Sequence, residues 1–497
     1  MINGNQIPKE VSRVTETLQK AGFEAYLVGG CVRDLIIGRE PKDWDVTTNA
    51  KPEQIQTLFV KTFYENDFGT VGVVNEDVLP AGRQVIRETL KVVEVTPFRI
   101  EGKYSDFRHP DSVKFSDKLG DDLKRRDFTM NAIAYDPAKG QGVDLYKGQG
   151  DIKDRIIRTV GEPADRFTED ALRIIRAIRF STELGFMINK ETSDAIEKYS
   201  SLLSKISIER IREEFNKIIM STNPMVGVIM LHRYGILKYI IPELEEGIGM
   251  EQNGDHIYDI WEHNLRALNH SADRDWPLDV RLAALLHDVG KSKTRVWSKD
   301  KDDWTFYGHD VVGGKMTTKI LLRLKYSNDL IYKVAKLVRH HLFFSDIDKI
   351  TLSAVRRIIR NVGPENVWDL MKVRACDRIG MGRPKETPYR LRKYESMIEE
   401  AMRAPVSVGM LKVDGAKIME ISKMKPGPKI GYILHALLEE VLDKPELNTQ
   451  EYLEKRSLEL LKLSDIELKL LGEKGKETKE ELEEKELSVI RKKYHVK

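Results

Sequence analysis

A change in hydrophobic periodicity near residue 155 is the feature that most constrains the fold. Before it, the apolar runs AYLVGG (25–30), FGTVGVV (68–74) and KVVEVTPF (91–98) have the length and β-branched content of buried strands, and a helical pattern precedes them. After about residue 160 apolar residues recur at helical spacing, and short Gly- or Pro-containing breaks separate the segments. We therefore predict an α+β chain, in which a mixed sheet with helices is followed by all-α domains.

The composition is typical of a globular protein, and the cytoplasm is the expected compartment. At roughly 150 residues per domain, the length of 497 residues suggests about three domains. The apolar runs are too short to span a bilayer, the N-terminus lacks a signal peptide pattern, and two cysteines are too few for a disulfide framework. Net charge is only +3, but basic residues cluster at 123–126, 173–179 and 353–360. These clusters suit a polyanionic partner or, equally, solvated helix faces.

The stretch LVGGCVRDLIIGREPKDWDVTT joins a glycine turn to two aspartates. Strand alternation places Asp43 and Asp45 on one side of a predicted strand. Two neighbouring carboxylates repel each other unless cations share them, and Mg²⁺ prefers such oxygen ligands. The turn at Gly29 and Gly30 allows backbone N–H groups to approach phosphate oxygens, and Arg33 adds a guanidinium fork. The pattern indicates nucleotidyl or phosphoryl transfer assisted by two metal ions.

GGCVRD followed by DWD resembles the signature of class II nucleotidyltransferases of the DNA polymerase β superfamily, a group that includes bacterial tRNA CCA-adding enzymes and poly(A) polymerases. The resemblance implies that the glycine turn holds a triphosphate and that Asp43 and Asp45 bind two Mg²⁺ ions. The segment DDLKRRDFTMNAIAYD (121–136) is similar to the family's part that contacts ribose and phosphate. The positions that match the family there are Arg125, Arg126, Asp127 and Asn131.

The segment EDALR (169–173) lies within a predicted helix, where Asp170 and Arg173 are three residues apart and share one face. One side chain offers acceptors and the other donors, so together they can read the Watson–Crick edge of a base. The motif resembles the amino-acid template with which CCA-adding enzymes choose CTP and ATP. Arg176 and Arg179 continue the row toward phosphates. The alternative is an intrahelical ion pair.

Three further features concern the loops and strands of the head. RIEGKYSDFRHP (99–110) resembles the flexible loop of the family. Glu94 is either a third strand carboxylate at the metal site or an ordinary strand residue. The connection 75–91 is longer than the compact hairpin expected of the family, and Pro80 and Gly82 favour a turn within it.

A second constellation, in the order H…HD…H…HH…D, resembles the HD superfamily of metal-dependent phosphohydrolases. Adjacent His287 and Asp288 could both reach a metal, Asp288 could bridge two ions, and Lys291 could hold a phosphate. The resemblance implies transition-metal ions and activity on phosphomonoesters or cyclic phosphates, although some HD domains of this family are vestigial. The implied metal ligands are His263, His287, Asp288, His309, His340, His341 and Asp377.

The resemblance extends over nearly the whole chain and implies four domains. These are a catalytic head (1–155), a helical neck that selects the base and binds RNA (156–245), an HD domain (246–385) and a helical tRNA-binding tail with a charged C-terminus (386–497). The implied function is template-independent addition of C, C and A from CTP and ATP to the tRNA 3′ end, without a membrane partner. The alternatives are an A-adding enzyme, a poly(A) polymerase and, from another class, an HD phosphohydrolase that uses the head to dock RNA.

Overall fold

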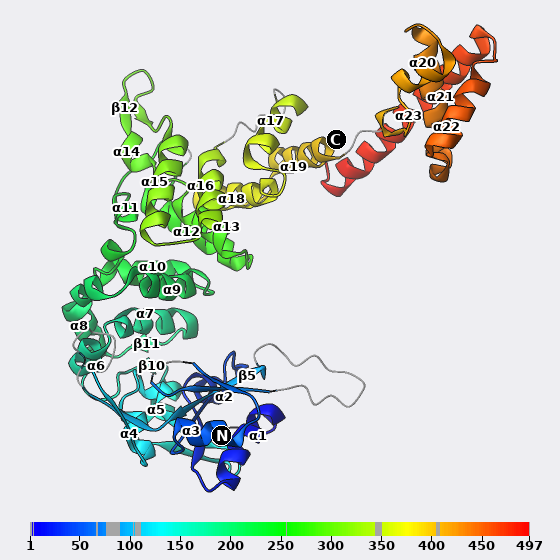
Figure 1. The fold of residues 1–497 in the computed structure, drawn as a ribbon. Coiled ribbons are helices and arrows are strands. Elements are labelled where there is room, and N and C mark those ends of the chain that lie inside the picture. Colours follow the sequence, from blue (N-terminus) through cyan, green and yellow to red (C-terminus); the bar gives the residue numbers. More distant parts are fainter. Residues whose placement is uncertain are drawn as a thin grey trace. The chain divides into compact units, whose positions relative to one another are not determined.

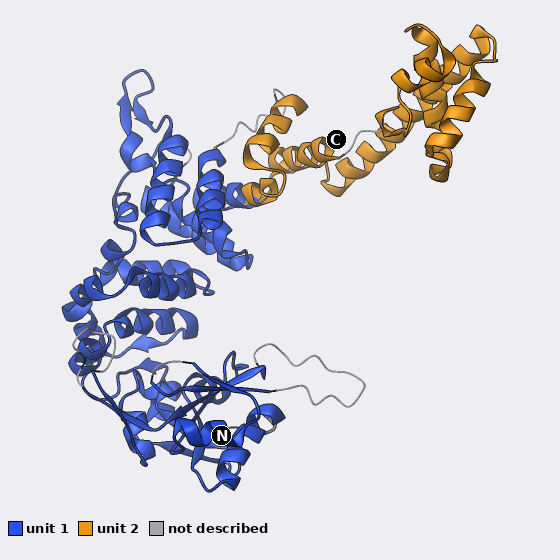
Figure 2. Ribbon diagram, in the orientation of Figure 1, with its two compact units in different colours: residues 1–341, 372–383 blue, residues 342–371, 384–497 orange. Residues whose placement is uncertain are grey.

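The computed structural model describes residues 2, 4–65, 68–75, 90–102, 104, 111–254, 256–342, 350–403 and 408–496. The chain forms two compact units, residues 1–341 with 372–383 and residues 342–371 with 384–497 (Figure 2). The predicted α+β class is confirmed. Every helix in the described ranges is too short or too polar to cross a bilayer.

The head is a mixed sheet of seven strands (Figure 1). In spatial order the strands are β3 (Thr62–Tyr64), β4 (Val71–Val74), β5 (Val92–Pro97), β2 (Asp45–Thr48), β1 (Ala25–Val28), β8 (Ile133–Asp136) and β9 (Gln141–Asp144). Among the described residues of this sheet, β2 and β5 form the one parallel pair. Strands β6 (Arg99–Glu101) and β7 (Val113–Phe115) form a separate ribbon. The three predicted strands are confirmed as β1, β4 and β5.

Helices of the head pack on this sheet through apolar residues at helical spacing. Val11, Val14 and Leu18 of α1 are fully buried, and α1 contacts β1. The helices are α1 (Lys9–Lys20), α2 (Gly30–Ile36), α3 (Pro52–Leu58), α4 (Leu119–Lys124) and α5 (Gly148–Asp154). The long connection predicted at 75–91 joins the paired strands β4 and β5, as expected of a hairpin, but its residues 76–89 lie outside the described residues.

The neck and the HD region continue the first unit. The neck contains α6 (Pro163–Glu169), α7 (Leu172–Leu184), α8 (Lys190–Tyr199), α9 (Ile208–Ile219), α10 (Pro224–Arg233) and α11 (Pro242–Glu245). The HD region contains α12 (Ile260–Asp273), α13 (Leu278–Leu286), α14 (Lys291–Thr294), α15 (His309–Arg323), α16 (Asn328–His340) and the end of α18 (Val367–Gly380). The expectation of purely helical domains is wrong in two places, because β10 (Ile156–Ile157) pairs with β11 (Met187–Ile188) and β12 (Val296–Ser298) pairs with β13 (Asp303–Thr305).

The second unit is helical. Besides the start of α18, it contains α17 (Leu352–Val362), α19 (Tyr389–Met402), α20 (Gly415–Ser422), α21 (Pro428–Asp443), α22 (Gln450–Leu460) and α23 (Asp465–Lys493). The charged C-terminal segment forms the long helix α23, which packs closely on α21. Gly472 and Gly475 permit this approach, since a Cβ on Gly475 would lie 2.3 Å from the carbonyl oxygen of His435.

Candidate functional site

Three carboxylates meet where β2 and β5 lie side by side. Asp45 opens β2 and stands opposite Glu94 in the parallel register, while Asp43 precedes β2 by two residues. Burial and then the charges of Asp45, Glu65 and Asp43 raise the pKa of Glu94 to about 7. Burial also raises the pKa of Asp45, with Asp43 acting in the same direction and Arg126 against it. Such mutually repelling oxygens fit divalent cations of the Mg²⁺ type.

The glycine turn faces these carboxylates. Gly29 precedes α2 with φ +84°, a conformation that favours glycine. A Cβ at this position would lie 3.1 Å from Nη1 of Arg126 and 3.4 Å from Oδ2 of Asp45. The first turn of α2, the Arg126 guanidinium and the carboxylate of Asp45 therefore meet in one place, as a triphosphate site beside metal ions requires.

Arg33 lies on α2, directly after the glycine turn, and its guanidinium contacts protein acceptors. Its side chain is buried on α2, and it donates to Oδ1 of Asp34 (2.8 and 3.0 Å) and to Oδ1 of Asn131 (2.9 Å). Its guanidinium carbon also lies 5.0 Å from the centre of the Phe180 ring. The guanidinium fork for which a triphosphate contact is predicted thus also contacts acceptors within the protein.

Asn131 continues this network into the neck. Its amide donates to Asp127 Oδ1 at 3.0 Å, and Arg176 of α7 donates to Asp127 Oδ2 at 2.6 and 2.9 Å. Burial acts to raise the pKa of Asp127, but Arg176 and Asn131 outweigh it and hold the pKa well below its usual range. Arg179 is 3.2 Å from Glu214 and stacks on Phe180. The predicted nucleotide contacts Asp127, Asn131 and Arg176 are therefore joined to one another.

The segment EDALR is not one continuous helix. α6 ends at Glu169 and α7 begins at Leu172, so Asp170 stands at the break with φ −132° and ψ 103°. Its carboxylate accepts from the backbone N–H of Leu172 at 3.1 Å and from Arg210 at 2.9 Å. The prediction that Asp170 and Arg173 share a helical face is wrong, because Asp170 follows the end of α6 and precedes Ala171, the N-cap of α7, and so lies outside both helices.

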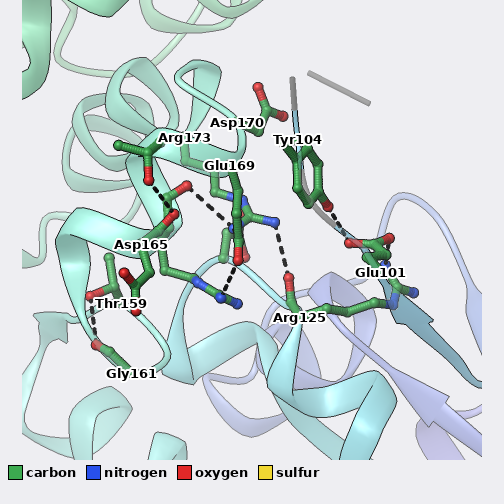
Figure 3. Close-up of polar contacts among 12 residues, drawn as sticks. Glu101, Tyr104, Arg125, Thr159, Gly161, Asp165, Glu169, Asp170 and Arg173 are labelled. Atoms are coloured by element: carbon green, nitrogen blue, oxygen red, sulfur yellow. Dashed lines mark hydrogen bonds and ion pairs between the residues drawn. The ribbon is translucent and has the colours of Figure 1, made fainter. Parts of the chain in front are cut away.

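Arg173 is held between the neck and the head (Figure 3). It donates to Oε2 of Glu169 at 2.7 Å and to the backbone carbonyl of Arg125 at 3.0 Å. The Arg125 side chain in turn donates to Glu101 at 3.1 Å, and the hydroxyl of Tyr104 donates to the same carboxylate. The loop predicted at 99–110 is thus represented at this site by its described residues Glu101 and Tyr104, while residues 103 and 105–110 lie outside the described residues.

Several partners of Asp170, Arg173 and Arg125 were not predicted. The pairing of Glu169 with Arg173 could have been predicted from their spacing of four residues. Arg210 and the contacts of Tyr104 could not, because no local pattern connects them with EDALR.

The HD histidines converge in a buried cluster. In His287, His309 and His341 the Nδ1 atom lies 2.7–2.8 Å from the backbone carbonyl three residues earlier. This contact fixes each ring so that its Nε2 atom faces Asp288 or Asp377. The Nε2 atoms of His263 and His287 are 2.8 Å apart, a distance that calls for a shared proton or cation.

The ligand atoms form two groups that share Asp288. The first group consists of His263, His287, Asp288 and Asp377, and the second of Asp288, His309 and His341. Nitrogen and carboxylate ligands in this arrangement fit transition-metal ions. Within the described residues His340 joins neither group, because the neighbouring His341 takes the inward position.

Lys291 lies at the edge of this HD cluster. Its ammonium is 2.5 Å from Oδ2 of Asp288 and donates to Gln252 at 2.6 Å. The predicted phosphate contact is therefore close to the metal ligands. Gln252, which the sequence analysis did not identify, is its second partner.

Comparisons with known proteins identify the family. Three family models match: Poly A polymerase head domain over residues 25–158, Probable RNA and SrmB- binding site of polymerase A over 185–248, and HD domain over 260–382. The CCA-adding enzyme of Lactobacillus delbrueckii subsp. bulgaricus is 33% identical over 440 residues, which cover 88% of this chain and 94% of that relative. The chain belongs to the CCA-adding enzyme family.

Two further CCA-adding enzymes are similar to different extents of the chain. That of Bacillus cereus is 47% identical over 220 residues, 44% of this chain and 52% of the relative. The crystal structure of the Bacillus stearothermophilus CCA-adding enzyme in complex with CTP has a TM-score of 0.57 at 28% identity and covers 91% of this chain and 96% of that chain. The resemblance found in the sequence is confirmed by these matches.

Proposed function

We propose that this protein adds C, C and A from CTP and ATP to the 3′ end of tRNA. The observation that carries the proposal is the position of Asp43, Asp45 and Glu94 opposite the Gly29 turn. The chain that contains them is similar to a CCA-adding enzyme over 94% of that relative's length. These nucleotides and tRNA belong to the cytoplasm, where we place the protein.

The carboxylates Asp43, Asp45 and Glu94 hold two Mg²⁺ ions in this proposal. When bound, such ions stabilise the charge on the attacking and leaving oxygens. The backbone N–H groups after Gly29 and the Arg126 side chain hold the triphosphate. Arg33, Asp127, Asn131 and Arg176 contact the nucleotide in this proposal. Their bonds to one another support an additional role in holding the head and the neck in register.

Asp170 and Arg173 select the base in this proposal. Each has a second partner that fixes its orientation, Arg210 for the aspartate and Glu169 for the arginine. A fixed donor and a fixed acceptor distinguish bases by their Watson–Crick edges better than mobile side chains, because less ordering accompanies binding.

The tRNA backbone is bound by cationic helices. On α17 the side chains of Arg356, Arg357 and Arg360 are exposed, and no described residue pairs with them, whereas Val355 and Val362 are buried. A row of unpaired guanidinium groups suits phosphates of a helical RNA arm. We keep the four domains at the boundaries given above and assign this contact to the end of the HD domain.

A second activity is proposed for the HD cluster, a metal-dependent phosphohydrolase with two transition-metal ions that share Asp288. Two complete ligand groups, with three histidine rings oriented by backbone carbonyls, support an active site over a vestigial one. Buried polar groups cost stability unless they are hydrogen-bonded, so in a site without function apolar residues could replace them with no loss of activity.

An extension assay tests the proposal. tRNAs that end in the discriminator base, in C or in CC are incubated with CTP, ATP or both and Mg²⁺. Ordered growth by C, C and A, abolished in Asp43→Ala/Asp45→Ala and retained in Asp288→Ala, is the expected result. Extension of only the CC-ending tRNA would indicate an A-adding enzyme, long A tails a polymerase, and no extension would refute the head's activity.

A further inference from the structure

A small hairpin projects from the HD helices (Figure 1). It consists of β12 and β13, in which Trp297 and Trp304 form a cross-strand pair with ring centres 5.1 Å apart. The side chains remain accessible, with 47% of Trp297 and 74% of Tyr307 exposed. Residues 295–307 are named the aromatic hairpin below. A hairpin of two strands is only marginally stable on its own, because it buries little apolar surface. Large rings that remain exposed on such a hairpin are typical of a binding surface.

Cations accompany these rings. The guanidinium carbon of Arg295 lies 3.7 Å from the centre of the Trp304 ring. The ammonium of Lys301 lies 5.3 Å from the centre of the Tyr307 ring and donates to its hydroxyl at 2.7 Å. Interleaved aromatic and cationic side chains are the combination with which proteins bind single-stranded nucleic acid, since bases stack on rings and phosphates meet cations.

The aromatic hairpin is continuous with the HD cluster at both ends. On the N-terminal side it follows α14, whose first residue Lys291 contacts Asp288. On the C-terminal side it leads into His309, whose Nδ1 is bonded to the carbonyl of Phe306. The Lys291 ammonium also lies 5.6 Å from the centre of the Phe306 ring, two residues beyond Trp304. Rings and cations therefore continue from the hairpin to the residues proposed to hold metal.

We propose that the aromatic hairpin docks a single-stranded RNA end whose terminal phosphate enters the HD cluster. The proposal rests on the phosphohydrolase activity proposed above and names its substrate class, a phosphorylated RNA end with unpaired bases. Packing of the two tryptophans against each other stabilises the hairpin itself. That role does not extend to Tyr307, which lies outside the paired strands and is mostly exposed.

Binding of a labelled ten-nucleotide RNA with a 3′-phosphate, followed by fluorescence anisotropy, tests the hairpin without hydrolysis. In the full-length protein we expect Tyr307→Ala to weaken binding about ten-fold, and Trp297→Ala/Tyr307→Ala to weaken it more, since base stacking has this magnitude. Tyr307→Ala leaves the strand pairs intact, so its effect does not depend on the hairpin's folding. The matched control is Tyr332→Ala, which removes a similarly exposed tyrosine from α16 and should leave binding unchanged.

Unchanged affinity in Tyr307→Ala would overturn the proposal, and so would an equal loss for a base-paired duplex, because stacking needs unpaired bases. Hydrolysis then separates the two proposals. With Mn²⁺ or Ni²⁺, Tyr307→Ala should raise KM for an RNA ending in a 2′,3′-cyclic phosphate and leave bis(p-nitrophenyl) phosphate hydrolysis unaltered. If wild type hydrolyses neither, the phosphohydrolase proposal fails while the anisotropy result still decides the role of the hairpin.

Discussion

Gly29→Ala is expected to impair catalysis through two effects that the structure separates. At φ +84° and ψ −136° an L-residue is strained by about 1–3 kcal/mol. The added methyl would also lie 3.1 Å from Nη1 of Arg126, so this guanidinium must move by a few tenths of an ångström beside Asp45. Since a displacement of about 1 Å at a reacting centre can lower a rate about 100-fold, this shift predicts about a ten-fold lower kcat for C addition. Single-turnover extension of tRNA with CTP measures it.

The control for this prediction is Gly22→Ala, in the same domain. Gly22 has φ +88°, and no atom lies within 4 Å of the point that an added methyl would occupy, so only the backbone strain is introduced. Both variants should lower the melting temperature, but Gly22→Ala should retain the wild-type kcat. Equal kcat in the two variants would refute the reasoning that the turn positions Arg126.

Three other predictions concern stability. Arg281 is buried and donates to the carbonyls of residues 219, 221 and 276, so Arg281→Ala should lower the free energy of unfolding in urea by about 3 kcal/mol. The control Arg323→Ala removes an exposed ion pair and should lower it by less than about 1 kcal/mol. The pKa of Asp127 is depressed in the folded protein, so its ionised form stabilises the fold above about pH 4, the pKa range of an unfolded aspartate, and this stabilisation is lost as pH falls. Asp127→Asn should therefore lower the free energy of unfolding at pH 7, and the difference from wild type should be smaller in urea titrations at pH 3. In circular-dichroism melting, Gly475→Ala should destabilise the α21–α23 pair by about 1–3 kcal/mol, because the added methyl meets the backbone of α21. Gly431→Ala adds a methyl to α21 where no atom lies within 4 Å, and it should stabilise the pair by about 0.5–1 kcal/mol. The opposite order would contradict the packing argument.

Local patterns were sufficient where one element determines the chemistry. The close pair Asp43 and Asp45 and the turn at Gly29 could be predicted without knowledge of their neighbours. The strand begins only at Asp45, however, so the prediction that strand alternation aligns Asp43 with it is wrong. The order of histidines and aspartates on helices predicted six residues that meet in the HD cluster. In these cases the residue type restricts the chemistry more than the tertiary environment does.

Side-chain direction depended on distant residues and was predicted less well. Arg33 donates twice to its neighbour Asp34, but its third bond is to Asn131, which is 98 positions away, and no local pattern could reveal that contact. Asp170 lies at a break in a run without Gly or Pro, where its carboxylate accepts from a backbone N–H and from Arg210, which is 40 positions away. Adjacent His340 and His341 are distinguished only by the rotation of their helix against the cluster. The β12–β13 hairpin did leave a signal, the two similar segments VWS and DWT around a polar turn.

The end of α4 connects the proposed base-selecting segment with the proposed metal site. The carbonyls of Lys124 and Arg125 accept hydrogen bonds from Arg166 and Arg173 of the neck, at 2.8 and 3.0 Å. Such carbonyls at a helix C-terminus lack partners within the helix and carry partial negative charge, which suits guanidinium donors. The next residue, Arg126, points the other way, toward the Gly29 turn beside Asp45. Because one short turn contacts both regions, a change that displaces it should alter nucleotide choice and rate together, whereas loss of Asp43 removes the chemistry alone.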